Sequence, residues 1–348
     1  PIEDLASFVR DLGSECTTLN MGHNYLVAGS KTGRITLWNT NTGQEGWTVE
    51  VEGPISDLEI DEEIYVTASA ELHAINKENG VLEWSVDIEG SSDLIEIDEN
   101  KIFVTSSLYE IEVQDYTETT FFTFDKNGQL LGSVNFEEKP WFMKKQNQKI
   151  ILGIGRPRCG ILTIDDKYNI SHSRTDGNSP VNMGIKTNKR FLLGHSDGTI
   201  TEINDSGRKY IQCGNDSITA ISSKDISWQA GDKNGNLFSS DGWSKKLGDR
   251  INCIVETKHH IWVSVTSKNN VVYLLDKGSG SIKHQFSHDY KIQLMKLLDN
   301  NLAISDEEGK VMFFDTKTLE KRIGTKSVIS EDLERRNLLK KRLRALRE

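Results

Sequence analysis

The sequence is short of the features that mark membrane, secreted and nucleic-acid-binding proteins. It has no run of about 18 apolar residues, which excludes a membrane-spanning helix. Its first segment, PIEDLASFVRDLG, is acidic and lacks the basic start and apolar stretch of a secretory signal, so we expect none. Acidic side chains outnumber basic ones by 52 to 42, and the net charge of −10 argues against a bulk nucleic-acid or anionic-membrane surface.

Cysteine is scarce and widely spaced. The four residues are Cys16, Cys159, Cys213 and Cys253, and no Cys-x-x-Cys pair occurs. Secreted disulfide frameworks and structural zinc sites need closer spacing. We therefore expect reduced, mostly buried thiols in a cytoplasmic, intracellular protein. One disulfide stays open as an alternative, because spatial proximity is not readable from the sequence.

Motifs of catalytic chemistry are missing as well. The sequence has no phosphate-binding Gly-x-x-x-x-Gly-Lys-Ser/Thr, no His-Glu-x-x-His and no nucleophile elbow. Its eight histidines are scattered, and the acidic turns 164–167 and 305–308 are typical of solvated carboxylates. We therefore predict no catalytic residue, no metal site and no cofactor, and a protein that is not an enzyme.

What the sequence does contain is a repeat. Short β-prone runs recur along nearly the whole chain, and the third run of each unit ends in a polar residue before a turn. These closing residues are Asn39, Asn76, Asp125, Asp165, Asn204, Ser240, Asp276 and Asp315. Successive gaps of 37, 49, 40, 39, 36, 36 and 39 residues suit four-stranded propeller blades. A helical solenoid would instead show an apolar period of about 3.6 residues.

The turns that follow these runs have a consistent chemistry. An Asn or Asp at a strand end accepts hydrogen bonds from the backbone two residues onward. A glycine then supplies the positive φ that the turn requires. The glycines are Gly43, Gly80, Gly128, Gly207 and Gly280.

Two segments carry a family resemblance. AINKENGVLEW (74–84) and WNTNTGQEGW (38–47) resemble the Ala-x-Asp-x-x-x-Gly-x-x-x-Trp signature of quinoprotein-type (PQQ-like) propeller repeats, with Asn76 in the Asp position. SKTGRITLWN and HSDGTITEIN are similar to WD-repeat pieces, although no Trp-Asp dipeptide occurs. The resemblance covers about residues 14–324 and implies that Trp47 and Trp84 dock between neighbouring blades. The family's dehydrogenases carry adjacent cysteines that this chain lacks, so no quinone cofactor is implied.

We predict an all-β, eight-bladed β-propeller with a C-terminal α-helix. Seven blades are the alternative, because residues 216–249 are weakly patterned. Residues 1–13 form a latch strand or a short helix, 14–326 the propeller and 327–348 an amphipathic helix. First strands are expected near residues 14, 54, 91, 139, 178, 216, 250 and 290.

Three features are candidates for partner contact. The tail 330–348 has seven basic and four acidic residues and is predicted to be a helix. It either packs back on the propeller rim or projects from it, or it docks on another protein or forms a short coiled coil, with contact to a phosphate backbone or acidic membrane as a further alternative. Its apolar face comprises Leu333, Leu339, Leu343 and Leu346. The second is the insertion 107–120 with Tyr109 and Tyr116. The third is the turn with Arg156 and Arg158, which we expect to form a basic patch with Lys144, Lys145 and Lys149. Trp141 and Phe142 are expected in the core.

These observations favour a non-enzymatic, intracellular scaffold for protein–protein interaction. The alternative is a propeller enzyme or small-ligand binder that uses the central channel. Because propellers bind through loops on a rigid frame, partner contact is expected on loop faces. The partner's identity is not encoded in any motif.

Overall fold

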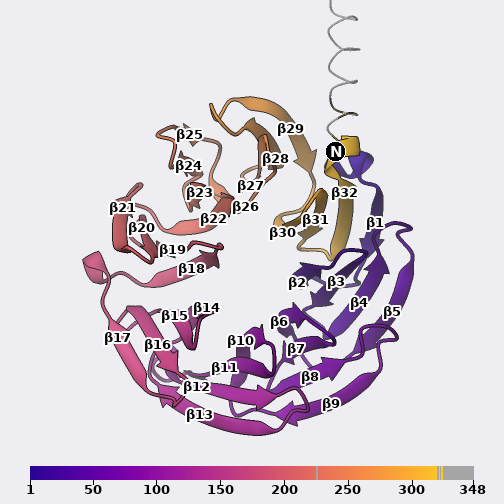
Figure 1. The fold of residues 1–348 in the computed structure, drawn as a ribbon. Helices are drawn as coiled ribbons and strands as arrows, with labels where there is room; N and C mark the ends of the chain where they lie inside the picture. The colour runs from indigo at the N-terminus through magenta and orange to yellow at the C-terminus, as the bar shows by residue number, and fades with distance from the viewer. Residues whose placement is uncertain (225, 320, 322, 324–348) are drawn as a thin grey trace, which may run out of the picture.

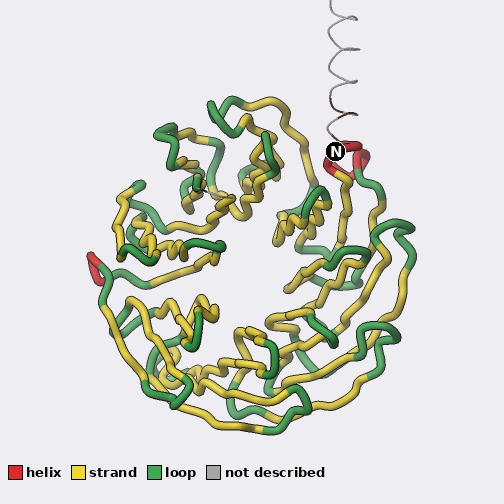
Figure 2. The backbone as a smooth tube through the Cα atoms, viewed as in Figure 1, coloured by secondary structure: helices red, strands yellow, loops and turns green. Residues whose placement is uncertain are grey.

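The chain forms a closed ring of eight four-stranded antiparallel sheets (Figures 1 and 2). The computed structural model describes residues 1–348 except 225, 320, 322 and 324–348. The count of eight blades is confirmed and the seven-bladed alternative is wrong. The first strand of every blade begins within three residues of its predicted start. The sequence repeat and its turn residues therefore correctly predict where each blade begins.

Each blade is built from the centre of the ring outward. The innermost strands are β2 (Cys16–Met21), β6 (Ile55–Ile60), β10 (Ser91–Asp98), β14 (Pro140–Gln146), β18 (Val181–Lys186), β22 (Ile218–Lys224), β26 (Arg250–Glu256) and β30 (Ile292–Leu298). The second strands are β3 (Tyr25–Ser30), β7 (Ile64–Ala68), β11 (Lys101–Glu110), β15 (Lys149–Ile154), β19 (Arg190–His195), β23 (Ser227–Asp232), β27 (His260–Thr266) and β31 (Asn301–Asp306). The third strands are β4 (Arg34–Asn39), β8 (Glu71–Ile75), β12 (Asp115–Asp125), β16 (Gly160–Asp165), β20 (Thr199–Asn204), β24 (Asn236–Ser239), β28 (Asn270–Asp276) and β32 (Lys310–Asp315). The outermost strands are β5 (Glu45–Glu50), β9 (Leu82–Asp87), β13 (Leu130–Phe136), β17 (Ile170–Ser173), β21 (Gly207–Gln212), β25 (Ser244–Lys246), β29 (Ile282–His288) and β1 (Phe8–Asp11). Two 3₁₀-helices are η1 (Ile2–Leu5) and η2 (Asp176–Asn178).

The burial of the strands explains their sequence patterns. A second strand such as β7 is buried along its whole length, because neighbouring blades cover both faces of the sheet. It therefore reads as a continuous apolar and β-branched run. An outermost strand such as β9 alternates between exposed and partly buried residues, since only one face packs. The core thus consists of apolar layers between successive blades.

The predicted turn chemistry is confirmed where the repeat is clearest. The Oδ1 atom of Asn76 accepts hydrogen bonds from the backbone N–H of Glu78 at 3.1 Å and of Asn79 at 3.3 Å. Asp125 accepts from Asn127 and Gln129 in the same way, at 2.9 and 2.8 Å. These side chains hold the outer hairpin that each third strand begins.

Trp47 and Trp84 dock between blades as the family resemblance implies. The Nε1–H of Trp47 donates to the carbonyl oxygen of Lys77 at 2.9 Å, and that of Trp84 donates to Lys126 at 3.1 Å. Each acceptor lies in the next blade. Both indoles therefore fix the angle between successive sheets with one hydrogen bond and one apolar ring face.

The N-terminal segment closes the ring. It begins as the 3₁₀-helix η1 and continues as β1, which pairs antiparallel with β32 in the register Phe8↔Phe313. The last blade is thus built from both ends of the described chain (Figure 1). Ile2 and Leu5 are buried in the same cluster as Leu319. Residues 316–319 are helical, whereas the predicted helix 327–348 lies outside the described residues.

Candidate interaction surface

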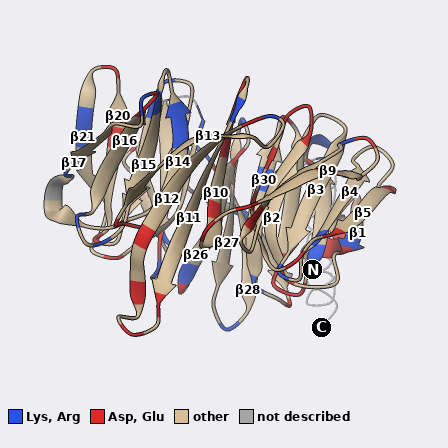
Figure 3. Cartoon of the chain, turned by 90° about the horizontal axis from the view of Figure 1, so that it is seen from below, with Lys and Arg blue, Asp and Glu red and all other residues tan. Residues whose placement is uncertain are grey.

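One hairpin is much longer than its neighbours. β11 and β12 pair as far as Glu110↔Asp115, but β10 pairs with β11 only up to Ser107 and β13 pairs with β12 only from Thr119. Beyond those residues the sheet has two strands instead of four. The insertion anticipated at 107–120 is therefore an extended hairpin that projects from one face of the ring (Figure 3). We call residues 107–120 the blade-3 hairpin.

The end of the blade-3 hairpin is apolar and exposed. The exposed fractions are 53% for Tyr109, 83% for Ile111 and 58% for Val113, and Leu108 is exposed too. Among the twelve exposed large hydrophobic residues of the described chain, these four are adjacent in one element. Contiguous exposed apolar side chains mark interaction sites more often than scattered ones do.

An aromatic cluster near the end of the hairpin connects it to blade four. Tyr109 packs edge-to-face on Tyr116, with ring centroids 5.2 Å apart. The Nζ atom of Lys139 lies 3.9 Å from the Tyr116 ring centroid and 5.3 Å from that of Trp141, and it pairs with Asp93. Aromatic side chains held in this way lose little further entropy on binding. Lys139 and the three rings join the hairpin to blade four.

The expectation for Trp141 is wrong. Its side chain is 48% exposed, whereas Phe142 is buried as expected. The pairing of β14 with β15 is irregular between Pro140 and Phe142, so Trp141 is left without a partner on β15 and is exposed, whereas Phe142 and Met143 are both buried. Trp141 thereby extends the exposed apolar surface. Tyr109, Ile111, Val113, Tyr116 and Trp141 are named here the blade 3–4 surface.

Arg156 and Arg158 lie in the β15–β16 turn, but the predicted basic patch does not form. Arg158 is held by the buried carboxylate of Glu138, with Nε to Oε1 at 2.5 Å and Nη2 to Oε2 at 2.7 Å. Burial alone would raise the pKa of Glu138, but the Arg158 guanidinium lowers it below its ordinary value. Arg156 is exposed.

The register of blade four explains why the predicted patch is absent. Pro140 pairs with Ile154 near the arginine turn, whereas Gln146 pairs with Lys149 at the other end of the two strands. Lys144, Lys145 and Lys149 therefore lie at the opposite end of the blade from Arg156 and Arg158. The remaining predicted contact residues, Leu333, Leu339, Leu343 and Leu346, lie outside the described residues.

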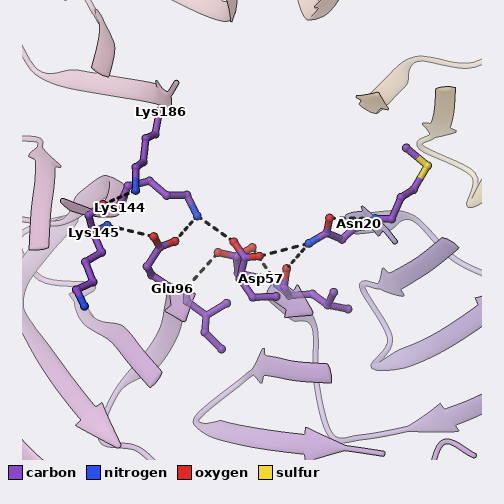
Figure 4. Close-up of polar contacts among 10 residues, drawn as sticks. Asn20, Asp57, Glu96, Lys144, Lys145 and Lys186 are labelled. Atoms are coloured by element: carbon purple, nitrogen blue, oxygen red, sulfur yellow. Dashed lines mark hydrogen bonds and ion pairs between the residues drawn. The ribbon is translucent and has the colours of Figure 1, made fainter. Parts of the chain in front are cut away.

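A polar belt joins the innermost strands. Lys144 pairs with Glu59 at 2.9 Å and also with Glu96, while Asn20 donates to the carbonyl oxygen of Leu58 at 3.3 Å (Figure 4). Burial opposes the charge of Lys144, but the two carboxylates outweigh it and raise its pKa. Lys144, Glu59 and Glu96 thereby connect three successive blades.

The same kind of link occurs at every joint between blades. From the first joint to the eighth, the links are Asn20 to Leu58, Ile95 to Asp57, Lys145 to Glu96, Lys186 to Lys145, Asn182 to Ser217, Thr219 to Ile251, Cys253 to Gln293 and Gln293 to Glu15. The belt is therefore continuous around the ring. Its polar groups serve to connect blades.

One cluster has the composition of a metal centre. Glu3, His288 and Asp306 place ligand atoms within 4.8 Å of one another. However, the two ring nitrogens of His288 face different carboxylates, Nε2 to Asp306 at 2.9 Å and Nδ1 to Glu3 at 3.6 Å. Lys310 also lies 3.0 Å from Glu3. The cluster thus fits a bridge that ties η1 to the last two blades better than an ion site.

Sequence reasoning missed a third docking tryptophan. Trp243 packs against Gly280 of the next blade, as Trp47 does against Gly80. The turn before Trp243 is short, so the spacing between the closing polar residue and the tryptophan differs from that of the PQQ-like signature. The sequence signal that remains is the Gly242-Trp243 pair at the end of the SSDGW turn.

Comparisons with known proteins agree with this architecture. The sequence model of the family described as outer membrane protein assembly factor BamB matches residues 7–94 and 31–131. Comparison with curated protein sequences gives no match. Within the described chain, no helix has the length and apolar character needed to cross a bilayer.

Three solved structures share the fold. The computationally designed Ika8 protein is 16% identical, with a TM-score of 0.72 over 88% of this chain and 98% of that one. BamB from Moraxella catarrhalis is 14% identical, with a TM-score of 0.67 and the same coverage. Saccharomyces cerevisiae Sqt1 is 12% identical, with a TM-score of 0.73 over 89% of this chain and 98% of that one. The predicted resemblance is thus confirmed: the chain is an eight-bladed β-propeller, and its residues 7–131 match the model of a family of PQQ-like repeats.

Proposed function

We propose that this protein is a non-enzymatic interaction scaffold that binds a protein partner through the blade 3–4 surface. The observation that carries the proposal is the exposed, aromatic hairpin on a rigid ring. Tyrosine and tryptophan are enriched among residues that dominate binding energy, and the surface presents Tyr109, Tyr116 and Trp141 together. A projecting hairpin also reaches a partner without any rearrangement of the blades.

Two observations favour a scaffold over channel chemistry. The carboxylates of Glu59 and Glu96 both pair with Lys144, so they connect neighbouring blades instead of serving as free catalytic groups. Burial raises the pKa of Cys253, on the innermost strand β26, to about 11, which disfavours a nucleophilic thiolate there. All four cysteines are free, which is in keeping with a reducing, cytoplasmic location, and we propose that location for this chain.

Affinity purification from the native cell tests the proposal. A hairpin variant would carry Tyr109→Ser, Ile111→Ser and Val113→Ser. The matched control would carry Val81→Ser and Leu82→Ser, which are also exposed but lie on blade two. We expect wild type and control to retain the same proteins and the hairpin variant to lose at least one of them. An identical set of proteins from all three would contradict the proposal.

A further inference from the structure

The blade-3 hairpin has an open strand edge. β13 pairs with β12 only from Thr119 onward, so within the described chain no strand pairs with the outer edge of residues 115–118. The opposite edge, at residues 108–110, is less open, because a Cβ on Gly90 would lie 3.2 Å from the Leu108 side chain. Unpaired backbone groups on an exposed edge are a template for a further strand.

The charge of the hairpin has one sign. Residues 107–120 contain Glu110, Glu112, Asp115 and Glu118 and no basic residue. Acidic side chains on this edge repel the same edge of a second copy, so the hairpin disfavours self-pairing. The same charges attract a segment that is rich in lysine or arginine.

The apolar side chains define the rest of the ligand. Ile111 and Val113 are exposed beside the acidic residues, and Tyr116 lies at the open edge itself. The side chains of an added strand alternate between its two faces. Apolar side chains on one face would contact Ile111, Val113 and Tyr116, and basic side chains on the other face would lie near the carboxylates. Apolar residues alternating with basic ones are therefore the sequence that this edge fits.

We propose that the outer edge of β12 at residues 115–118 binds a basic, extended peptide segment as an added β-strand. This inference rests on the proposed function and names the chemistry of the partner. The bound segment lies antiparallel or parallel to β12, with its lysine or arginine side chains near Asp115 and Glu118.

Fluorescence anisotropy with labelled synthetic peptides tests the inference. The probe is a peptide of alternating lysine and valine. One comparison peptide has glutamate for lysine, and another has proline at alternate valines, which keeps the charge but blocks strand pairing. We expect the lysine–valine peptide to bind about tenfold more tightly than either comparison peptide.

Charge-reversal variants locate the binding. Asp115→Lys with Glu118→Lys is expected to weaken binding of the lysine–valine peptide about tenfold. The control, Glu78→Lys with Glu83→Lys, changes the net charge equally on blade two and is expected to leave binding unchanged. Circular dichroism and thermal unfolding check that both variants fold.

Each contrary outcome has a clear meaning. Equal binding of the proline peptide overturns strand addition, and equal weakening by the blade-two control overturns the location. If the hairpin variant loses its cellular partner but no basic peptide binds, the proposed function stands and this inference fails. If the partner is retained and no peptide binds, both fail.

Discussion

Single tryptophan–glycine contacts set the spacing between blades. Trp47, Trp84 and Trp243 each cover a glycine of the next blade, where an added Cβ would lie 2.6 to 2.9 Å from the indole. These glycines also have positive φ, so the position demands glycine for two independent reasons. The contact therefore couples the glycine turn of one blade to the tryptophan indole of the preceding blade.

The two reasons can be separated by substitution. Gly80→Ala adds both a left-handed alanine and a clash with Trp47, whereas Gly242→Ala adds only the left-handed alanine, since nothing lies within 4 Å of its Cβ. We expect Gly242→Ala to cost about 1 kcal/mol and Gly80→Ala to cost about 1–3 kcal/mol more. Urea unfolding midpoints measure the difference. Equal losses would show that the indole contact does not constrain the turn.

Asp57 gives the polar belt a pH dependence. Burial raises its pKa from 3.8 to about 6, although the backbone N–H groups of Ile95 and Leu58 donate to it. Because the folded state holds this proton more tightly than the unfolded state, stability from Asp57 falls as the pH rises from about 4 to about 6. Above about pH 6 the destabilisation from the buried Asp57 carboxylate no longer changes with pH.

The variant Asp57→Asn does not titrate and keeps an acceptor for Ile95. We expect wild type to lose up to about 3 kcal/mol relative to Asp57→Asn between pH 4 and pH 6. Unfolding free energies of both proteins across this range supply the measurement. Parallel pH profiles would contradict the raised pKa.

At the scale of the element, the N-terminal segment is the piece that closes the ring. β1 supplies the outermost strand of the last blade, and Ile2 of η1 is fully buried beneath it. The bridge of Glu3 to His288 and Lys310 fixes the same segment from its polar side. Without it, the edge of β32 would be exposed to solvent and to other chains.

Ile2→Ala tests this role. The loss of a fully buried isoleucine side chain is expected to lower the unfolding free energy by about 2–4 kcal/mol. Ile111→Ala, at the exposed hairpin end, makes the same chemical change and is expected to alter it by less than about 0.5 kcal/mol. Chemical unfolding compares the two variants. Similar small effects would mean that the segment is not part of the closed ring.

The sequence predicted what local physics determines and left open what depends on distant contacts. Blade starts followed from strand patterns and Asx turns, which act over a few residues. Two alternatives remained for residues 1–13, because the pairing of Phe8 with Phe313 leaves no local signal. Trp141 was misplaced because it lies in an irregularity of the β14–β15 pairing that no sequence pattern marks, and Trp243 was missed because its turn is shortened.

At the scale of the whole molecule, the ring is a rigid frame. Polar links join all eight pairs of neighbouring blades, and apolar layers fill the space between them. The long hairpin extends beyond its own four-stranded sheet, and Tyr109, Ile111 and Val113 on it are exposed. We therefore place partner binding at the blade-3 hairpin. The charged groups of the inner strands, in this account, hold neighbouring blades together.

Hydrogen–deuterium exchange on the protein alone and on its affinity-purified complex tests this division most directly. The account predicts that partner binding protects the amides of residues 105–120, 139, 141 and 142. It also predicts that the turns after the inner strands, at 61–63, 99–100 and 147–148, keep their exchange rates. Protection of those turns with an unaltered hairpin would contradict it and would favour the central channel as the binding site.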